Sequence, residues 1–79
     1  MNIERLVSMA NQIAAFFESV PDGQQASGEI AHHLRMFWEP RMRRKLIETV
    51  ESGEAEGLNP LVKNALIENR AELWSRREG

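Results

Sequence analysis

Pro40 interrupts a chain whose apolar residues otherwise recur at the spacing of an α-helix. The residue before a proline is disfavoured in the α region, whereas proline itself fits the first position of a helix. We therefore expect one helix to end near Trp38 or Glu39 and another to begin at Pro40. We call residues 34–47 the elbow. It carries bulky side chains before the proline and cations after it: Met36, Phe37, Trp38, Arg41, Arg43, Arg44 and Lys45.

The apolar spacing and the turn residues predict four helices and no strand. Asn2 and Asp22 are suited to cap the first two helices, and Asn59–Pro60 is a strong signal for the start of the fourth. The acidic, glycine-containing stretch 51–57 is the one clear loop. We expect a single all-α domain, a small bundle spanning residues 1–79, with helices at approximately 3–19, 23–38, 40–52 and 60–74.

Composition restricts the functions open to this chain. It has no cysteine, which excludes disulfides and thiolate metal ligands, and its formal net charge of −2 disfavours a protein whose main task is to neutralise phosphates. The N-terminus does not resemble a signal peptide, and no apolar run approaches the roughly 18 residues of a membrane span. We expect a soluble, cytoplasmic protein that does not bind membranes.

Catalytic and metal-binding patterns are missing from the sequence. His32 and His33 are adjacent, so on a helix they point about 100° apart and cannot act as an i, i+4 ligand pair. Glu29 with His33 supplies only two ligands, and we expect one histidine at the edge of the core and the other in solvent. No serine lies in a recognisable nucleophile motif. We expect no catalytic residue, no cofactor-binding residue and no metal ligand.

The aromatic and cationic residues favour a docking role. A core this small cannot bury every aromatic side chain, and aromatic residues and arginine are enriched at the energetic centres of protein interfaces. A second apolar stripe on the last helix, at Ile67, Ala71 and Trp74, points away from its core stripe. The predicted partner-binding residues are Phe37, Trp38, Pro40, Arg41, Met42, Arg43, Arg44 and Trp74.

Two other functions use the same features. A small nucleic-acid-binding regulator would use the cationic cluster Arg41–Lys45, although the helix that carries these cations becomes acidic further along. A homo-oligomer of the isolated chain would instead close its extra apolar stripe on a second copy. Nucleic acid is the less favoured of the possible partners, because the overall charge provides little long-range attraction.

One family resemblance agrees with a docking role. The run Phe37-Trp38-Glu39-Pro40-Arg41-Met42-Arg43 is unusual, and it is preceded by Met9-Ala10-Asn11-Gln12-Ile13, Phe16-Phe17, Ile30-Ala31 and His33-Leu34. Together these residues resemble the delta subunit of the soluble, NAD-dependent, molybdenum-containing formate dehydrogenases. The likeness is strongest over residues 1–50 and continues more loosely through Leu58-Asn59-Pro60-Leu61-Val62.

The resemblance implies a non-catalytic accessory subunit of a cytoplasmic oxidoreductase complex. In that family the alpha subunit carries the molybdopterin cofactor and iron–sulfur clusters, and the delta subunit is associated with assembly, cofactor maturation or stability. The expected partner is therefore the alpha subunit. The resemblance places no catalytic residue on this chain, and the docking role of the elbow remains an inference from residue types.

Overall fold

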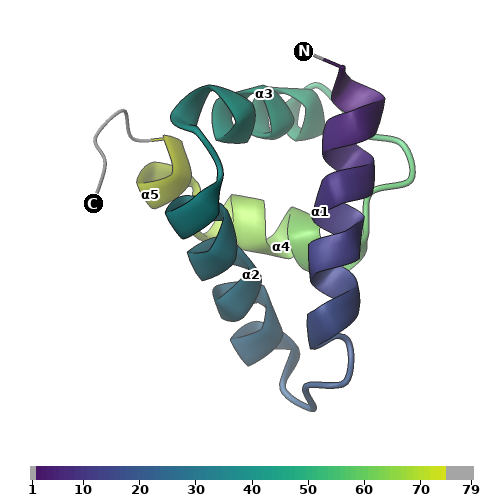
Figure 1. Cartoon of the computed structure of the whole chain (residues 1–79), viewed down its shortest axis with the longest axis vertical. Coiled ribbons are helices and arrows are strands. Elements are labelled where there is room, and N and C mark those ends of the chain that lie inside the picture. Colours follow the sequence, from purple (N-terminus) through teal and green to yellow (C-terminus); the bar gives the residue numbers. More distant parts are fainter. Residues whose placement is uncertain (1, 75–79) are drawn as a thin grey trace.

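The computed structural model describes residues 2–74 of the 79-residue chain, and this part is helical without strands (Figure 1). The small all-α fold predicted from the sequence is confirmed. The helices are α1 (Ile3–Phe17), α2 (Gly23–Phe37), α3 (Pro40–Glu51), α4 (Pro60–Glu68) and α5 (Arg70–Trp74).

Local sequence signals explain where these helices begin. The side-chain oxygen of Asn2 accepts a hydrogen bond from the backbone N–H of Glu4 at 2.9 Å, and the carboxylate of Asp22 accepts one from the N–H of Gln24 at the same distance. Such bonds satisfy N–H groups that have no partner within the helix. Helices α3 and α4 both begin at a proline. Each expected helix start is confirmed.

The expected fourth helix, 60–74, is broken at Asn69 into α4 and α5. Asn69 has φ −118° and ψ 27°, outside the α-helical region, and its side-chain amide donates to the Ala65 carbonyl at 3.0 Å. Asparagine side chains compete in this way with backbone hydrogen bonds. The break redirects the chain so that Leu73 is fully buried and α5 packs mainly on α3.

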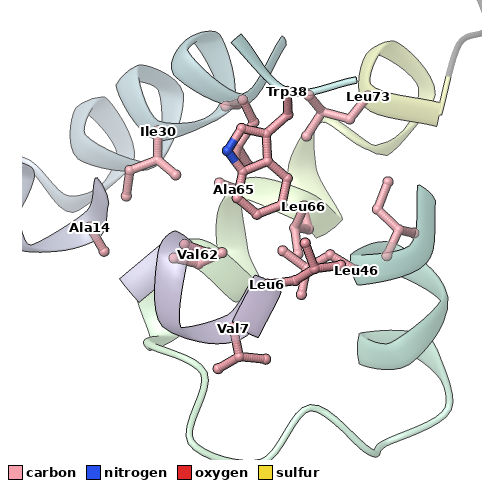
Figure 2. Packing of buried hydrophobic residues seen from close by; sticks show 14 residues of the cluster. Leu6, Val7, Ala14, Ile30, Trp38, Leu46, Val62, Ala65, Leu66 and Leu73 are labelled. Carbon is pink, nitrogen blue, oxygen red and sulfur yellow. The ribbon is translucent and has the colours of Figure 1, made fainter. Parts of the chain in front are cut away.

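Helices α1 and α2 diverge from the short loop that joins them, and α3 crosses the open end between them (Figure 1). Helix α4 lies behind this frame and makes its most extensive contacts with α2. The buried apolar side chains come from all five helices and from Trp38, whose indole projects toward Ala65 and Leu66 (Figure 2). One contiguous core therefore holds the elements together.

Asn11 attaches the loop between α3 and α4 to the side of α1. Its amide donates to the Gly57 carbonyl at 2.9 Å, and its side-chain oxygen accepts from the Asn59 N–H at 2.8 Å. Asn59 also donates through its own amide to Glu18 at 2.7 Å. Gly53 and Gly57 have φ of 79°, where glycine avoids the strain of a side chain. These contacts fix the position at which α4 begins.

None of the helices within residues 2–74 combines the length and the apolar character needed to cross a lipid bilayer.

Candidate functional site

The elbow is built around the buried guanidinium of Arg43, which is only 2% exposed. Its Nε donates to the Leu73 carbonyl at 3.0 Å, and its Nη1 donates to the carbonyls of Arg35 at 3.1 Å and Trp38 at 2.9 Å. These three acceptors lie on α5, on the last turn of α2, and in the connection to α3. Arg43 therefore joins the two sides of the elbow to the C-terminal helix.

Trp38 occupies the turn of the elbow and is 7% exposed. Its backbone is extended, with φ −93° and ψ 141°, and its N–H donates to the Leu34 carbonyl at 3.0 Å. Glu39, which directly precedes the proline, is also extended, as expected at that position. The conformation of Trp38 directs the indole back under the end of α2 and into the core (Figure 2). One of the two tryptophan side chains of the chain thus packs near Ala65 and Leu66 of α4 and Leu73 of α5 (Figure 2).

These positions correct the expectation that Trp38 and Arg43 lie on the docking surface. Both side chains face inward because a core this small closes around its largest apolar group, and because the guanidinium satisfies carbonyls at the elbow and on α5. Both side chains are buried beneath the surface of the elbow.

The other predicted docking residues reach the surface to different extents. Phe37 is 73% exposed and its ring centroid lies 4.7 Å from that of His33. Arg41 is exposed, whereas Pro40, Met42, Arg44 and Trp74 are half-buried. Met42 and Trp74 both pack part of their surface against the core.

Three exposed large apolar side chains lie outside the predicted docking set: Phe16, Met36 and Ile67. Met36 belongs to the elbow, whereas Phe16 lies near the end of α1 and is 81% exposed. Adjacent residues on a helix point about 100° apart, so Phe16 and Phe17 cannot both face one core. Their adjacency in the sequence therefore indicates that one of the two phenylalanines is exposed. The outward position predicted for Ile67 is confirmed.

Helices α3 and α5 form an open groove of about 380 Å³. Its lining comprises Arg41, Arg44, Lys45, Glu48 and Trp74. The Arg44 guanidinium carbon lies 6.0 Å from the Trp74 ring centroid, at the outer limit for attraction between a cation and an aromatic face. The structure therefore brings together a large part of the predicted cationic cluster with the tryptophan predicted on the last helix.

Arg70 also lies over the Trp74 ring. Its guanidinium carbon lies 4.7 Å from the indole centroid, and the same group forms an ion pair with the Glu51 carboxylate at the end of α3. The hydrogen bond from Arg70 lowers the pKa of Glu51 below its usual range and raises that of Arg70. Both side chains are nearly half exposed, so salt screens this pair.

The Glu51–Arg70 pair makes a pH-dependent contribution to stability with a defined sign. A carboxyl with a lowered folded-state pKa stabilises the fold fully above its unfolded pKa, about 4.3, and loses that contribution as the pH falls through the lowered value. We expect the NMR-detected titration midpoint of the Glu51 carboxyl to rise in Arg70→Gln and to rise in wild type on addition of salt. An unchanged midpoint in Arg70→Gln would mean that Arg70 is not the group that lowers the pKa of Glu51.

The remaining candidate ligands do not form a metal centre within residues 2–74. No group of three or more histidine, cysteine, aspartate or glutamate side chains in this part of the chain is arranged to hold a metal ion. His33 is half-buried against Phe37, and His32 is exposed. The two histidines thus differ in exposure, as predicted, and the ring of His33 contacts the mostly exposed Phe37.

Comparison with known protein families finds a match over most of the chain. The family model described as the NADH-dependant formate dehydrogenase delta subunit matches residues 5–66. The matched segment includes the whole elbow and ends within α4. Neither a curated protein nor a solved structure matches the chain.

Proposed function

Since the chain belongs to the delta-subunit family of NADH-dependent formate dehydrogenases, we propose that it is a non-catalytic accessory subunit of such a complex in the cytoplasm. In this proposal it binds the alpha subunit, which carries molybdopterin and iron–sulfur clusters in this family, and it holds no cofactor itself. It supports assembly, cofactor maturation or stability of the complex. The single observation that carries the proposal is the family match over residues 5–66.

The proposed contact surface is the elbow together with the groove beside it. Phe37 is the best candidate for an apolar anchor, because most of its ring is exposed and burial on a partner would remove that area from water. Six predicted residues remain available for this surface: Phe37, Pro40, Arg41, Met42, Arg44 and Trp74. Trp38 and Arg43 contribute by holding the surface in shape.

A nucleic-acid-binding function is less well supported. The carboxylate of Glu48 lies in the groove among the cations, and the chain carries a formal net charge of −2. Both features weaken the attraction of a phosphate backbone, which dominates affinity in nucleic-acid complexes.

Affinity purification tests the proposed function. The tagged subunit is purified from the native cytosol, its partners are identified by mass spectrometry, and formate-dependent NAD reduction is assayed in the eluate. We expect recovery of the molybdenum-containing subunit with activity. Recovery of the tagged chain alone, from cells that express the enzyme, would contradict the proposal and favour self-association or nucleic-acid binding.

Phe37→Ala is expected to weaken the complex by about 2 kcal/mol if Phe37 is an anchor, which corresponds to roughly a thirtyfold loss of affinity. Phe16→Ala is the matched control, because it removes the same atoms from an exposed phenylalanine on α1. Binding is measured by titration of the purified partner, and circular dichroism checks each fold. Loss of affinity in Phe16→Ala alone would move the docking surface to α1.

A further inference from the structure

The cations of the groove have no carboxylate partners within the described chain. The ion pair formed by exposed side chains of residues 2–74 joins Arg70 to Glu51, and neither Arg41, Arg44 nor Lys45 is part of it. Arg44 instead lies over Trp74. Arg41 lies three and four residues before Arg44 and Lys45 on α3, and like charges at these spacings repel one another. A ligand that supplies negative charge would relieve this repulsion.

The groove also has an apolar component. Trp74 is half-buried and forms one wall, while Arg70 covers part of its ring at 4.7 Å from the centroid. The Glu51–Arg70 ion pair holds that arginine in place between α3 and α5. A fitting ligand therefore combines negative charge with a small apolar group that packs on the uncovered part of the indole.

These features favour a peptide over a nucleic acid. Arg70 already occupies one stacking position on Trp74, which hinders the stacking of bases that single-stranded nucleic acids require. Glu48 would repel a continuous run of phosphates, whereas a peptide can place its carboxylates selectively near the cations. A volume of about 380 Å³ accommodates a few side chains rather than a long polymer.

We propose that the groove between α3 and α5 binds an acidic segment of a partner protein, with carboxylates against Arg41, Arg44 and Lys45 and an apolar side chain against Trp74. Assigning that segment to a formate dehydrogenase subunit rests on the proposed function. The preference of the groove for an acidic peptide rests only on its lining.

An NMR titration tests the chemistry of the groove on the isolated subunit. The probe is the peptide Glu-Glu-Leu-Glu-Glu-Leu-Glu with blocked ends, and the control peptide has glutamine in place of each glutamate. We expect the acidic peptide to shift the indole N–H signal of Trp74 and the backbone signals of Arg41 and Arg44, and added salt to reverse the shifts. The signal of the buried Trp38 should remain unchanged.

Charge reversal separates a specific groove from general electrostatic attraction. Arg41→Glu/Arg44→Glu should reduce the affinity for the acidic peptide about tenfold or more. Arg5→Glu/Lys63→Glu makes the same change in net charge at exposed positions on α1 and α4, and it should leave most of the affinity intact. Equal effects of the two double variants, or no binding by the wild type, would overturn the proposal.

The assembled complex tests the assignment of the segment. A zero-length carbodiimide reagent joins an amine to a carboxylate in contact, so Lys45 should become linked to an aspartate or glutamate of the co-purified subunit, and Lys63 should not. Arg41→Glu/Arg44→Glu should lose the partner, whereas the matched variant should retain it. If the wild type recovers no formate dehydrogenase subunit, the proposed function fails, and the peptide titration alone decides the inference.

The same variants test whether the groove binds nucleic acid instead. If a short oligothymidine shifts the Trp74 and Arg44 signals more strongly than the acidic peptide, and if Arg41→Glu/Arg44→Glu abolishes that effect, the groove binds nucleic acid. That outcome would overturn the assignment to an acidic protein segment.

Discussion

Trp38→Ala is expected to destabilise the isolated subunit by about 3–5 kcal/mol, which is typical of truncating a buried aromatic side chain. The indole is 7% exposed and contacts a core supplied by every helix. A chain of this length has a total stability of about 4–12 kcal/mol, so the variant should lose a large part of it. Urea denaturation followed by circular dichroism measures the change directly.

Phe37→Ala is the matched control, because it removes a large aromatic group one position earlier in the chain. Phe37 is mostly exposed, so this change should alter the free energy of unfolding by no more than about 0.5 kcal/mol. Trp38→Phe should have an intermediate effect, because it keeps an aromatic ring in the core. Wild-type stability of Trp38→Ala would contradict the buried position of the indole.

The two neighbouring aromatic residues should therefore affect the complex for different reasons. Loss of a partner in Trp38→Ala would follow from loss of the fold, whereas loss in Phe37→Ala would report a contact. Stability measured on the free subunit distinguishes the two cases. The docking hypothesis is thus tested at Phe37, although the sequence alone favoured Trp38 equally.

Arg43→Met should destabilise the subunit by about 3 kcal/mol or more. Methionine retains most of the apolar length of arginine but cannot donate hydrogen bonds. The carbonyls of Trp38 and Leu73 would therefore lose the hydrogen bonds that the guanidinium donates to them. Each buried polar group left without a partner costs about 1–3 kcal/mol, and bonds from charged donors lie at the upper end of the range. Thermal and urea denaturation measure the loss.

Two controls isolate the hydrogen bonds of Arg43. Arg43→Lys keeps the positive charge, but a single ammonium cannot reproduce the planar guanidinium that reaches α5 and the elbow together, so it should rescue only part of the stability. Arg41→Met makes the same chemical change at an exposed position two residues earlier and should be nearly neutral. Equal effects at the two positions would contradict the structural role of Arg43.

Hydrogen exchange should show where Arg43→Met acts. The Nε bond to the Leu73 carbonyl attaches α5 to the elbow, and α5 is only five residues long. A helix of that length is not stable without tertiary contacts. Amides of α5 should therefore lose protection before those of α1, whose contacts do not depend on this arginine.

The helix break at Asn69 could not be predicted from the apolar spacing of the sequence. The apolar spacing continues from Val62 to Leu73, which predicted one helix, yet the chain leaves the helical region at Asn69. Asparagine tolerates both conformations, so its side chain alone does not decide. After the break, Leu73 is fully buried and α5 packs on α3, α2 and α4, and these tertiary contacts are not visible in the sequence.

The sequence also does not predict which member of each neighbouring aromatic pair is buried. Phe16 and Phe17 are adjacent aromatic residues, and so are Phe37 and Trp38. In each pair the first side chain is exposed and the second lies in or against the core. Two neighbouring residues cannot point in the same direction, and the sequence does not say which one faces the core. The sequence shows the cationic cluster, but it does not show that Arg43 is buried while Arg41 and Arg44 line the groove.

The sequence by itself determined the helical class, the helix starts at Asn2, Asp22, Pro40 and Pro60, and the family, because these depend on local backbone chemistry and on the order of residues. Only the tertiary structure decided which elbow residues are buried, where the last helix breaks, and how Trp74 meets the cations of α3. Those choices depend on contacts between segments far apart in the chain. Burial of one side chain becomes favourable only when the elements around it have closed.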